Sequence, residues 1–206
     1  MPDYCHQLTC QEMLDRDTES ASLSPAVGSM FQVDGVAPGA GLQFAYNVMF
    51  FPESCEISGY LVLAGAADMA RKAIKGESFE HDDLIKIMPF GFSAGATATV
   101  VIAEPVGQNT HDSQSWTGYF KSGSGSLLLG AAGAFWSDDW AGIEFGGAAG
   151  APAGAVFSFQ HYSLKHTKKV ECRTCIALRT ALTVDPVATA RRVGEIFKTI
   201  GQIISE

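Results

Sequence analysis

TGYFKSGSGSLLLGAAGAFW, residues 117–136, is the stretch of sequence that decides the fold class. Aromatic and aliphatic residues alternate in it with glycine, serine and alanine. Small residues within strands are typical of places where backbones approach closely and bend tightly. We therefore interpret residues 117–136 as a pair of strands that closes a β-barrel.

Strand-like runs recur on both sides of this stretch. They are rich in aromatic and β-branched residues and are separated by glycine and proline. The runs are FQV at 31–33, GLQFAYNVMFF at 41–51, EISGYLVLAG at 56–65, DLIKIMPFGF at 83–92, TATVVIAEP at 97–105, GIEF at 142–145 and AVFSFQHYSL at 155–164. The runs at 83–92 and 97–105 predict one hairpin, and those at 142–145 and 155–164 predict another.

So many strands, without long helices alternating between them, favour an all-β barrel over a parallel α/β sheet. Closure would also protect the edges of these apolar strands. We expect an irregular N-terminal lead at 1–27, with a short helical turn at 11–16. A glycine-rich barrel domain at 28–165 and a basic segment with a C-terminal helix at 166–206 follow.

Two further helices are expected. Residues 67–75 have apolar residues at helical spacing and predict a short inserted helix. Asp185 and Pro186 supply a cap and a first position for an amphipathic C-terminal helix of about five turns. Its apolar face carries Val187, Ala190, Val193, Phe197, Ile200 and Ile204. This face favours docking on the barrel or on another subunit, and binding to a membrane surface is the alternative.

Composition and charge limit the partners. Hydrophobic residues make up 47% of the 206 residues and charged residues 17%, which is typical of a globular chain. The net charge is −8, with 13 acids and 4 bases in residues 1–83 but 4 acids and 8 bases in residues 161–206. An acidic body argues against a nucleic-acid partner. Neither a classical signal peptide nor a transmembrane segment is recognisable, which predicts a cytoplasmic or non-classically secreted protein.

The five cysteines permit two interpretations. Cys5 and Cys10 near one end, and Cys172 and Cys175 near the other, could form a thiolate zinc cluster together with His6. The first pair is spaced too widely for a typical zinc knuckle, so reduced or disulfide-paired cysteines are preferred. No metal and no cofactor is therefore predicted, and the pairing, including that of Cys55, stays open.

A catalytic alternative comes from GFSAG at 91–95, which matches the nucleophile elbow of serine hydrolases and would expose Ser93. An elbow requires a helix after its serine, whereas ATATVVIA is rich in β-branched residues and predicts a strand. A triad also needs a histidine and an acid, for which the candidates are His161, His166, Asp138 and Asp139.

The runs EISGYLVLAGAA, IKIMPFGF, TATVVIAE and WTGYFKSGSGSLLLGAAGAFW resemble, in this order, the virulence-associated protein A family, first known from a bacterial pathogen of macrophages. The resemblance covers roughly residues 30–137. It is best carried by Gly118, Gly123, Leu127 to Leu129, Gly130, Gly133 and Trp136. It implies a compact eight-stranded antiparallel barrel with Greek-key connections and a short helix. It also implies a non-enzymatic effector or interaction module that acts at membranes or in host compartments.

Six residues are the candidates for contact with a protein or a membrane surface: Trp116, Phe135, Trp136, Trp140, Phe197 and Ile200. For the aromatic residues around 117–136, packing in the core or at the rim of the barrel is the alternative. No catalytic residue is predicted. The serine hydrolase and a barrel that binds a small hydrophobic ligand are the alternative functions, and the oligomeric state stays open.

Overall fold

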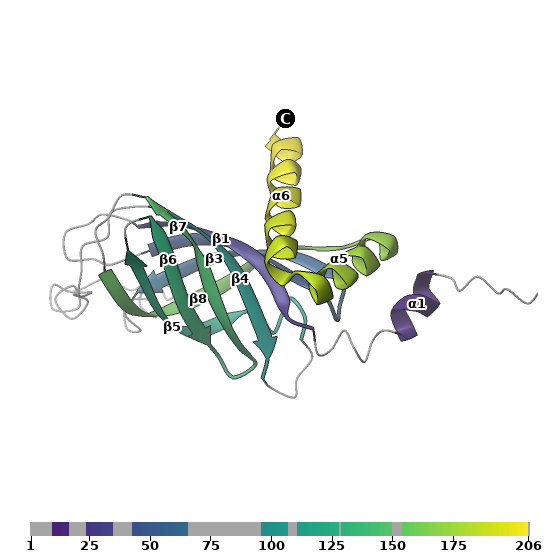
Figure 1. The fold of residues 1–206 in the computed structure, drawn as a ribbon, viewed down its shortest axis with the longest axis horizontal. Coiled ribbons are helices and arrows are strands. Elements are labelled where there is room, and N and C mark those ends of the chain that lie inside the picture. The colour runs from purple at the N-terminus through teal and green to yellow at the C-terminus, as the bar shows by residue number, and fades with distance from the viewer. Residues whose placement is uncertain are drawn as a thin grey trace, which may run out of the picture.

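Eight antiparallel strands close into a barrel in the computed structural model, which describes residues 10–16, 24–34, 43–65, 96–106, 111–127, 129–149 and 154–205 (Figure 1). The predicted all-β barrel is thereby confirmed. The strands are β1 (Ala26–Asp34), β2 (Gln43–Phe51), β3 (Glu56–Gly65), β4 (Ala96–Pro105), β5 (Gly118–Leu127), β6 (Gly130–Trp136), β7 (Trp140–Ala149) and β8 (Gly154–Lys169).

The barrel consists of two Greek keys. Around the barrel the order is β1-β2-β3-β8-β5-β6-β7-β4, and β4 pairs with β1 to complete the circle. Strands β1, β2 and β3 follow one another as neighbours, and β4 returns to lie beside β1. Strands β5, β6 and β7 do the same, with β8 beside β5. Each group of four thus has the Greek-key order, and the groups meet at β3–β8 and β4–β7.

Residues 117–136 form the strand pair that their sequence predicts, with Lys121 opposite Trp136 and Leu127 opposite Gly130. Both predicted hairpins, however, are wrong. Strand β4 has its two edges occupied by β1 and β7, and residues 83–92 lie outside the described residues. Strand β7 pairs with β4 and β6, whereas β8 pairs with β3 and β5. In a Greek key the fourth strand crosses to a distant neighbour, so consecutive strands need not pair.

Alternate residues of each strand point into the barrel, as the pleat of a strand requires. Aromatic side chains dominate this interior core: Phe51, Tyr60, Trp116, Phe120, Phe135, Trp140 and Tyr162. Their polar atoms are satisfied within it. The indole Nε1 of Trp116 donates to Asn47 Oδ1 at 3.1 Å, and the hydroxyl of Tyr60 donates to the carbonyl oxygen of Ser113 at 2.7 Å. Large buried rings can therefore fill this part of the barrel without leaving unpaired donors.

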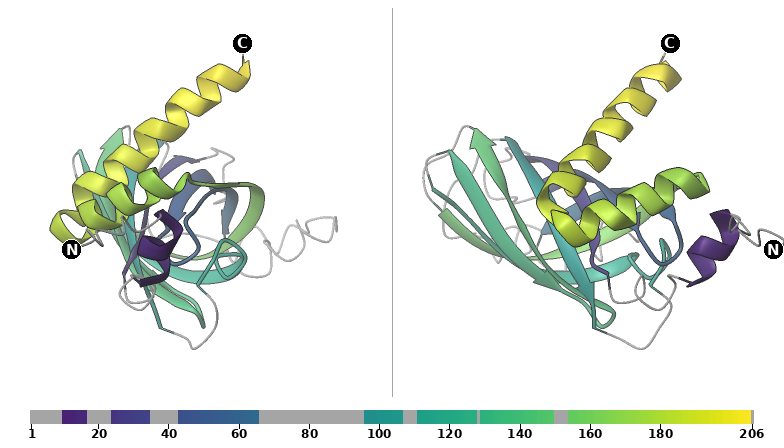
Figure 2. Two further views of the ribbon diagram at one scale, coloured as in Figure 1. Left: turned by 90° about the vertical axis from the view of Figure 1, so that its right-hand side faces the viewer. Right: turned by 45° about the vertical axis from the view of Figure 1, so that its right-hand side comes forward.

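A second core lies outside the barrel wall. Helices α5 (Cys172–Val184) and α6 (Pro186–Ser205) follow β8, and Figure 2 shows them against one side of the barrel. Leu178, Leu182, Ala190 and Val193 pack there against outward residues of the wall, namely Val27, Val48, Phe50, Ile57 and Val100. Docking of the C-terminal helix on the barrel is confirmed for Ala190 and Val193. The far end of α6 stands clear of the barrel in both views of Figure 2.

Three helix predictions have different outcomes. The helical turn at 11–16 is confirmed as α1 (Cys10–Arg16), and the C-terminal helix begins at Pro186 as expected. The inserted helix at 67–75 lies outside the described residues. Helix α5 was not predicted, because CRTCIALRTALTV contains cysteines and threonines of low helix propensity. Its tertiary contacts with the barrel compensate for this composition.

Asp185 joins the two C-terminal helices. Its backbone N–H donates to the carbonyl oxygen of Ala181 at 2.8 Å, and its Oδ1 accepts from the N–H of Ala188 at 2.9 Å. We expect Asp185→Ala to lower the free energy of unfolding by about 1 kcal/mol, the usual effect of removing an N-cap. Urea denaturation measures this loss. Asp185→Asn keeps an acceptor and should retain most of the stability, whereas equal losses in both variants would contradict a capping role.

Candidate functional site

Three of the predicted contact residues lie in the interior core. Trp116, Phe135 and Trp140 are at most 2% exposed. The indole Nε1 of Trp140 donates to Ser115 Oγ at 3.0 Å, and the Trp116 and Trp140 rings meet edge to face with centroids 5.3 Å apart. The prediction that these three side chains contact a partner surface is therefore wrong, because they point into the barrel. The alternative, core packing, describes them.

The other three candidates have separate outcomes. Trp136 is 43% exposed on the outside of β6, directly opposite Lys121 of β5. It is therefore accessible to a partner. Phe197 and Ile200 belong to α6, but their side chains lie outside the part of the structure that is described. Their role in contact stays a prediction.

A different group of side chains forms an exposed apolar surface on the described strands. These outward residues come from five neighbouring strands, and we call them the aromatic wall: Phe31 of β1, Phe44 and Tyr46 of β2, Leu61 and Leu63 of β3, His161 of β8 and Tyr119 of β5. Phe31 is 55% exposed, Phe44 48% and Tyr119 46%. Contiguous exposed apolar patches of this kind typically mark interaction sites.

Strand register makes the wall continuous. In one row Phe31 lies opposite Tyr46, and Tyr46 lies opposite Leu61. The adjacent row connects four strands through the pairs Phe44 with Leu63, Leu63 with His161, and His161 with Tyr119. Directly opposed residues of one sheet face have Cβ atoms about 5 Å apart, so each row is a line of contacting side chains.

Strand β2 explains why the wall is exposed. Its outward residues are apolar along the whole strand, but the helices cover only half of them. Val48 and Phe50 pack under α5 and α6, whereas Phe44 and Tyr46 remain open. An antiparallel strand with one wet face should alternate between apolar and polar residues. QFAYNVMFF does not alternate, and this was the sequence signal that could have revealed the wall.

Two histidines are fixed against tyrosines on this side of the barrel. The Tyr46 hydroxyl and His166 Nε2 lie 3.2 Å apart in a hydrogen bond that passes over Gly59, where a Cβ atom would overlap both side chains. The ring of His161 packs edge-on against Tyr119 with centroids 4.8 Å apart. Burial lowers the pKa of His161, so its imidazole is neutral at neutral pH.

At the described positions of the strands that carry the wall, the exposed charges have the opposite sign to the net charge of the chain. Lys121 of β5 and Lys165 of β8 are exposed beside it, and Lys168 of β8 is exposed two rows further along, opposite Ile57. Among the outward positions of β1, β2, β3, β5 and β8 whose side chains are described, none is an aspartate or a glutamate. In a chain of net charge −8, the charges at these described outward positions are therefore basic and lie around an apolar centre.

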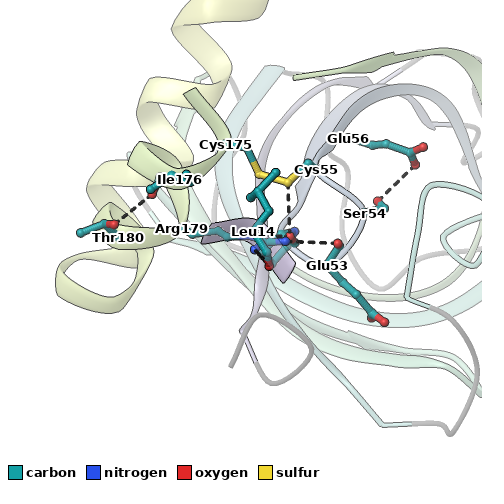
Figure 3. The surroundings of a disulfide bond; sticks show 10 residues. Leu14, Glu53, Ser54, Cys55, Glu56, Cys175, Ile176, Arg179 and Thr180 are labelled. Carbon is teal, nitrogen blue, oxygen red and sulfur yellow. Dashed lines mark hydrogen bonds between the residues drawn. A yellow bond between two sulfur atoms is a disulfide. The ribbon is translucent and has the colours of Figure 1, made fainter. Parts of the chain in front are cut away.

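A disulfide attaches the helices to the barrel. Cys55, in the turn between β2 and β3, is bonded to Cys175 of α5, 120 residues away (Figure 3). Next to this bond, Arg179 of α5 donates from Nε to the carbonyl oxygen of Pro52 at 2.8 Å. Cys172 is disulfide-bonded as well. The zinc hypothesis is therefore wrong for Cys172 and Cys175, because disulfide sulfurs are not thiolate ligands.

The described residues show no arrangement of side chains that supports the serine hydrolase alternative. Ser93 lies outside them. His166 hydrogen-bonds to Tyr46, and His161 Nδ1 lies 3.3 Å from the hydroxyl oxygen of Ser163. In the part of the chain that is described, no cluster of three or more histidine, cysteine or acidic side chains is arranged to hold a metal ion. Nor is any of the described helices long and apolar enough to cross a membrane.

Comparisons with protein-family models, with curated proteins and with solved structures find no match for this chain. The fold and the site nevertheless define a class of protein. It is a closed barrel of eight strands in two Greek keys, with an aromatic interior core. Helices α5 and α6 are attached to it by a disulfide, and the aromatic wall on its outer surface is exposed.

Proposed function

We propose that the protein is a non-enzymatic interaction module that binds anionic membrane surfaces through the aromatic wall. The observation that carries this proposal is the combination of exposed Phe31, Phe44 and Tyr119 with flanking lysines and no acid at the described outward positions of the same strands. The proposal agrees with the membrane-acting module that the resemblance to the virulence-associated protein A family implies.

Two contributions to membrane binding add to each other: burial of the aromatic side chains and attraction between the lysines and anionic lipids. Aromatic side chains have large apolar surfaces, and tyrosine can keep its hydroxyl hydrated, so such residues favour the boundary between headgroups and acyl chains. Each lysine near an anionic leaflet contributes about 1 kcal/mol of attraction, which salt screens. The wall is also rigid, because each of its strands is hydrogen-bonded on both sides within the closed barrel. Its side chains can therefore insert without a loss of backbone order.

The disulfides support a site of action outside a reducing cytoplasm. Such bonds form and persist in oxidising compartments and are rare in cytosolic proteins. The bond between Cys55 and Cys175 joins two structural layers, and Cys172 takes part in another. Of the two locations expected from the sequence, these bonds favour export.

Co-sedimentation with vesicles tests the proposal. We expect the protein to bind vesicles of phosphatidylcholine with phosphatidylserine more tightly than vesicles of phosphatidylcholine alone, and the difference to shrink at high salt. The double variant Phe31→Ser, Phe44→Ser should bind at least about tenfold more weakly, since each phenylalanine side chain buried from water contributes roughly 1.5–3 kcal/mol.

A matched control exists on the other side of the barrel. Ile143 of β7 is 52% exposed but lies outside the wall, so Ile143→Ser should leave vesicle binding unchanged. Equal binding by the wall variant and the unsubstituted protein would contradict the proposal. So would equal losses in the wall variant and in Ile143→Ser.

A further inference from the structure

A carboxyl group is buried inside the barrel, on the opposite side of the sheet from the aromatic wall's outer surface. Glu144 of β7 points inward and is 6% exposed. Directly opposite it on the neighbouring strands are Val101 of β4 and Gly133 of β6. Its Oε2 atom makes no hydrogen bond. A buried carboxyl oxygen without a partner is costly, so its retention in a folded protein needs a specific explanation, of which a bound ion is one.

The surroundings of Glu144 differ from the aromatic part of the core. Three buried polar side chains also come from inward positions of the barrel: Thr99 of the neighbouring β4, and Ser122 of β5 and Gln160 of β8, which lie two and three strands away. The hydroxyl of Tyr162 donates to Gln160 Oε1 at 2.9 Å. Glu144 is the only charged residue among the buried residues that the structure describes. Among the buried residues that are described, this region therefore offers a carboxylate and neutral hydrogen-bonding groups, but no cation.

The inward side chains are small in the part of the barrel where Glu144 lies. On β5 and β6 the inward positions there are Ser122, Ser124, Ala131 and Gly133. The next inward positions along these two strands, toward the aromatic core, are Phe120 and Phe135. Eight-stranded barrels are either filled by side chains or hold one small ligand. Aromatic rings fill one part here, and small or polar residues line the other.

We propose that the polar part of the barrel interior binds a small organic ammonium ion, with Glu144 as its counter-ion. The N–H groups of an ammonium ion would give Oε2 the donor that it lacks, and the neighbouring hydroxyl and amide groups can accept the remaining hydrogen bonds. A purely hydrophobic ligand would leave this carboxyl oxygen unpaired. The inference is independent of the membrane-binding proposal, because it concerns the inside of the barrel.

An NMR titration of the Glu144 side-chain carboxyl in the full chain tests this inference. Burial raises the pKa of Glu144 to about 7. A ligand that prefers the ionised carboxylate by about tenfold lowers the midpoint by about one pH unit. We therefore expect methylammonium or propylammonium chloride to lower the midpoint by about that amount relative to sodium chloride at equal ionic strength. Tetramethylammonium, which has no N–H donor, should have no effect.

Binding measured by calorimetry provides the second readout. Heats with propylammonium should be lost in Glu144→Gln and retained in Glu104→Gln, where Glu104 is an exposed residue of β4. A midpoint that is the same in ammonium and sodium salts would overturn the inference. Equal effects of tetramethylammonium and methylammonium would also overturn it. The midpoint experiment uses the unsubstituted protein and so does not depend on the folding of a variant.

Discussion

The double variant Cys55→Ser, Cys175→Ser is expected to lose about 2–4 kcal/mol of unfolding free energy in oxidising buffer. The bond joins residues 120 positions apart, so it strongly restricts the unfolded chain. The chain-entropy relation gives nearly 5 kcal/mol for a loop of about this length. We expect a smaller loss, because Cys172 is three residues from Cys175 and is also disulfide-bonded. Urea or guanidinium unfolding followed by circular dichroism measures the difference.

Reducing agent provides the matched control for the disulfide. With dithiothreitol the unsubstituted protein also loses its cross-links, so its unfolding midpoint should fall to that of the double variant or below it. The barrel itself should survive, because the interior core does not include the helices. Hydrogen exchange should accelerate most in α5, where Cys175 and Arg179 attach the helix to the β2–β3 turn. Equal midpoints of the two proteins without reducing agent would contradict a stabilising role of this bond.

Glu144→Gln is expected to remove a strong pH dependence of stability. Burial raises the pKa of Glu144 from 4.5 to about 7. Below pH 4.5 the carboxyl is protonated in both the folded and the unfolded state. Between pH 4.5 and 7 the unfolded state releases its proton first, so the folded state loses stability as pH rises. Above pH 7 the loss is complete and amounts to about 3 kcal/mol.

The measurement compares unfolding free energies at pH 4.5 and pH 8 in an amine-free buffer. From the lower to the higher pH, the stability of Glu144→Gln relative to the unsubstituted protein should rise by about 3 kcal/mol. Glu104→Gln removes a carboxylate from the exposed side of β4 without touching the barrel interior, and it serves as the control. A Glu144→Gln difference that does not change with pH would show that the carboxyl is not held in a desolvated site.

The strand content of the barrel could be predicted from sequence, but the pairing of the strands could not. Residues 117–136 combine a short connection with aromatic ends, and such local signals determine a strand pair. No local signal tells that β8 lies between β3 and β5, since that choice depends on how the two Greek keys meet. The same limit explains why the hairpin predicted between 142–145 and 155–164 is wrong.

The candidate site was predictable only in part, because the face to which a residue belongs depends on strand register. Trp136 points outward, whereas its neighbour Phe135 points inward. Because they are adjacent in the sequence, both were predicted as contact residues, but the pleat of the strand places them on opposite faces of the sheet. Phe44 and Tyr46 belong to a strand that is apolar along its whole length, so its sequence does not show which residues are covered. Their exposure depends on the point at which α6 leaves the barrel. The bond between Cys55 and Cys175 likewise depends on the three-dimensional arrangement of distant segments.

Tryptophan fluorescence with brominated lipids tests the central claim, contact through the aromatic wall, most directly. Trp136→Phe removes the exposed tryptophan, since Trp116 and Trp140 are buried. In that background, Phe44→Trp places a reporter on the wall, and Ile143→Trp places one outside it. Vesicles that contain phosphatidylserine and brominated phosphatidylcholine are predicted to quench the reporter at 44 and to leave the one at 143 unchanged. Quenching at 143 but not at 44 would contradict the claim.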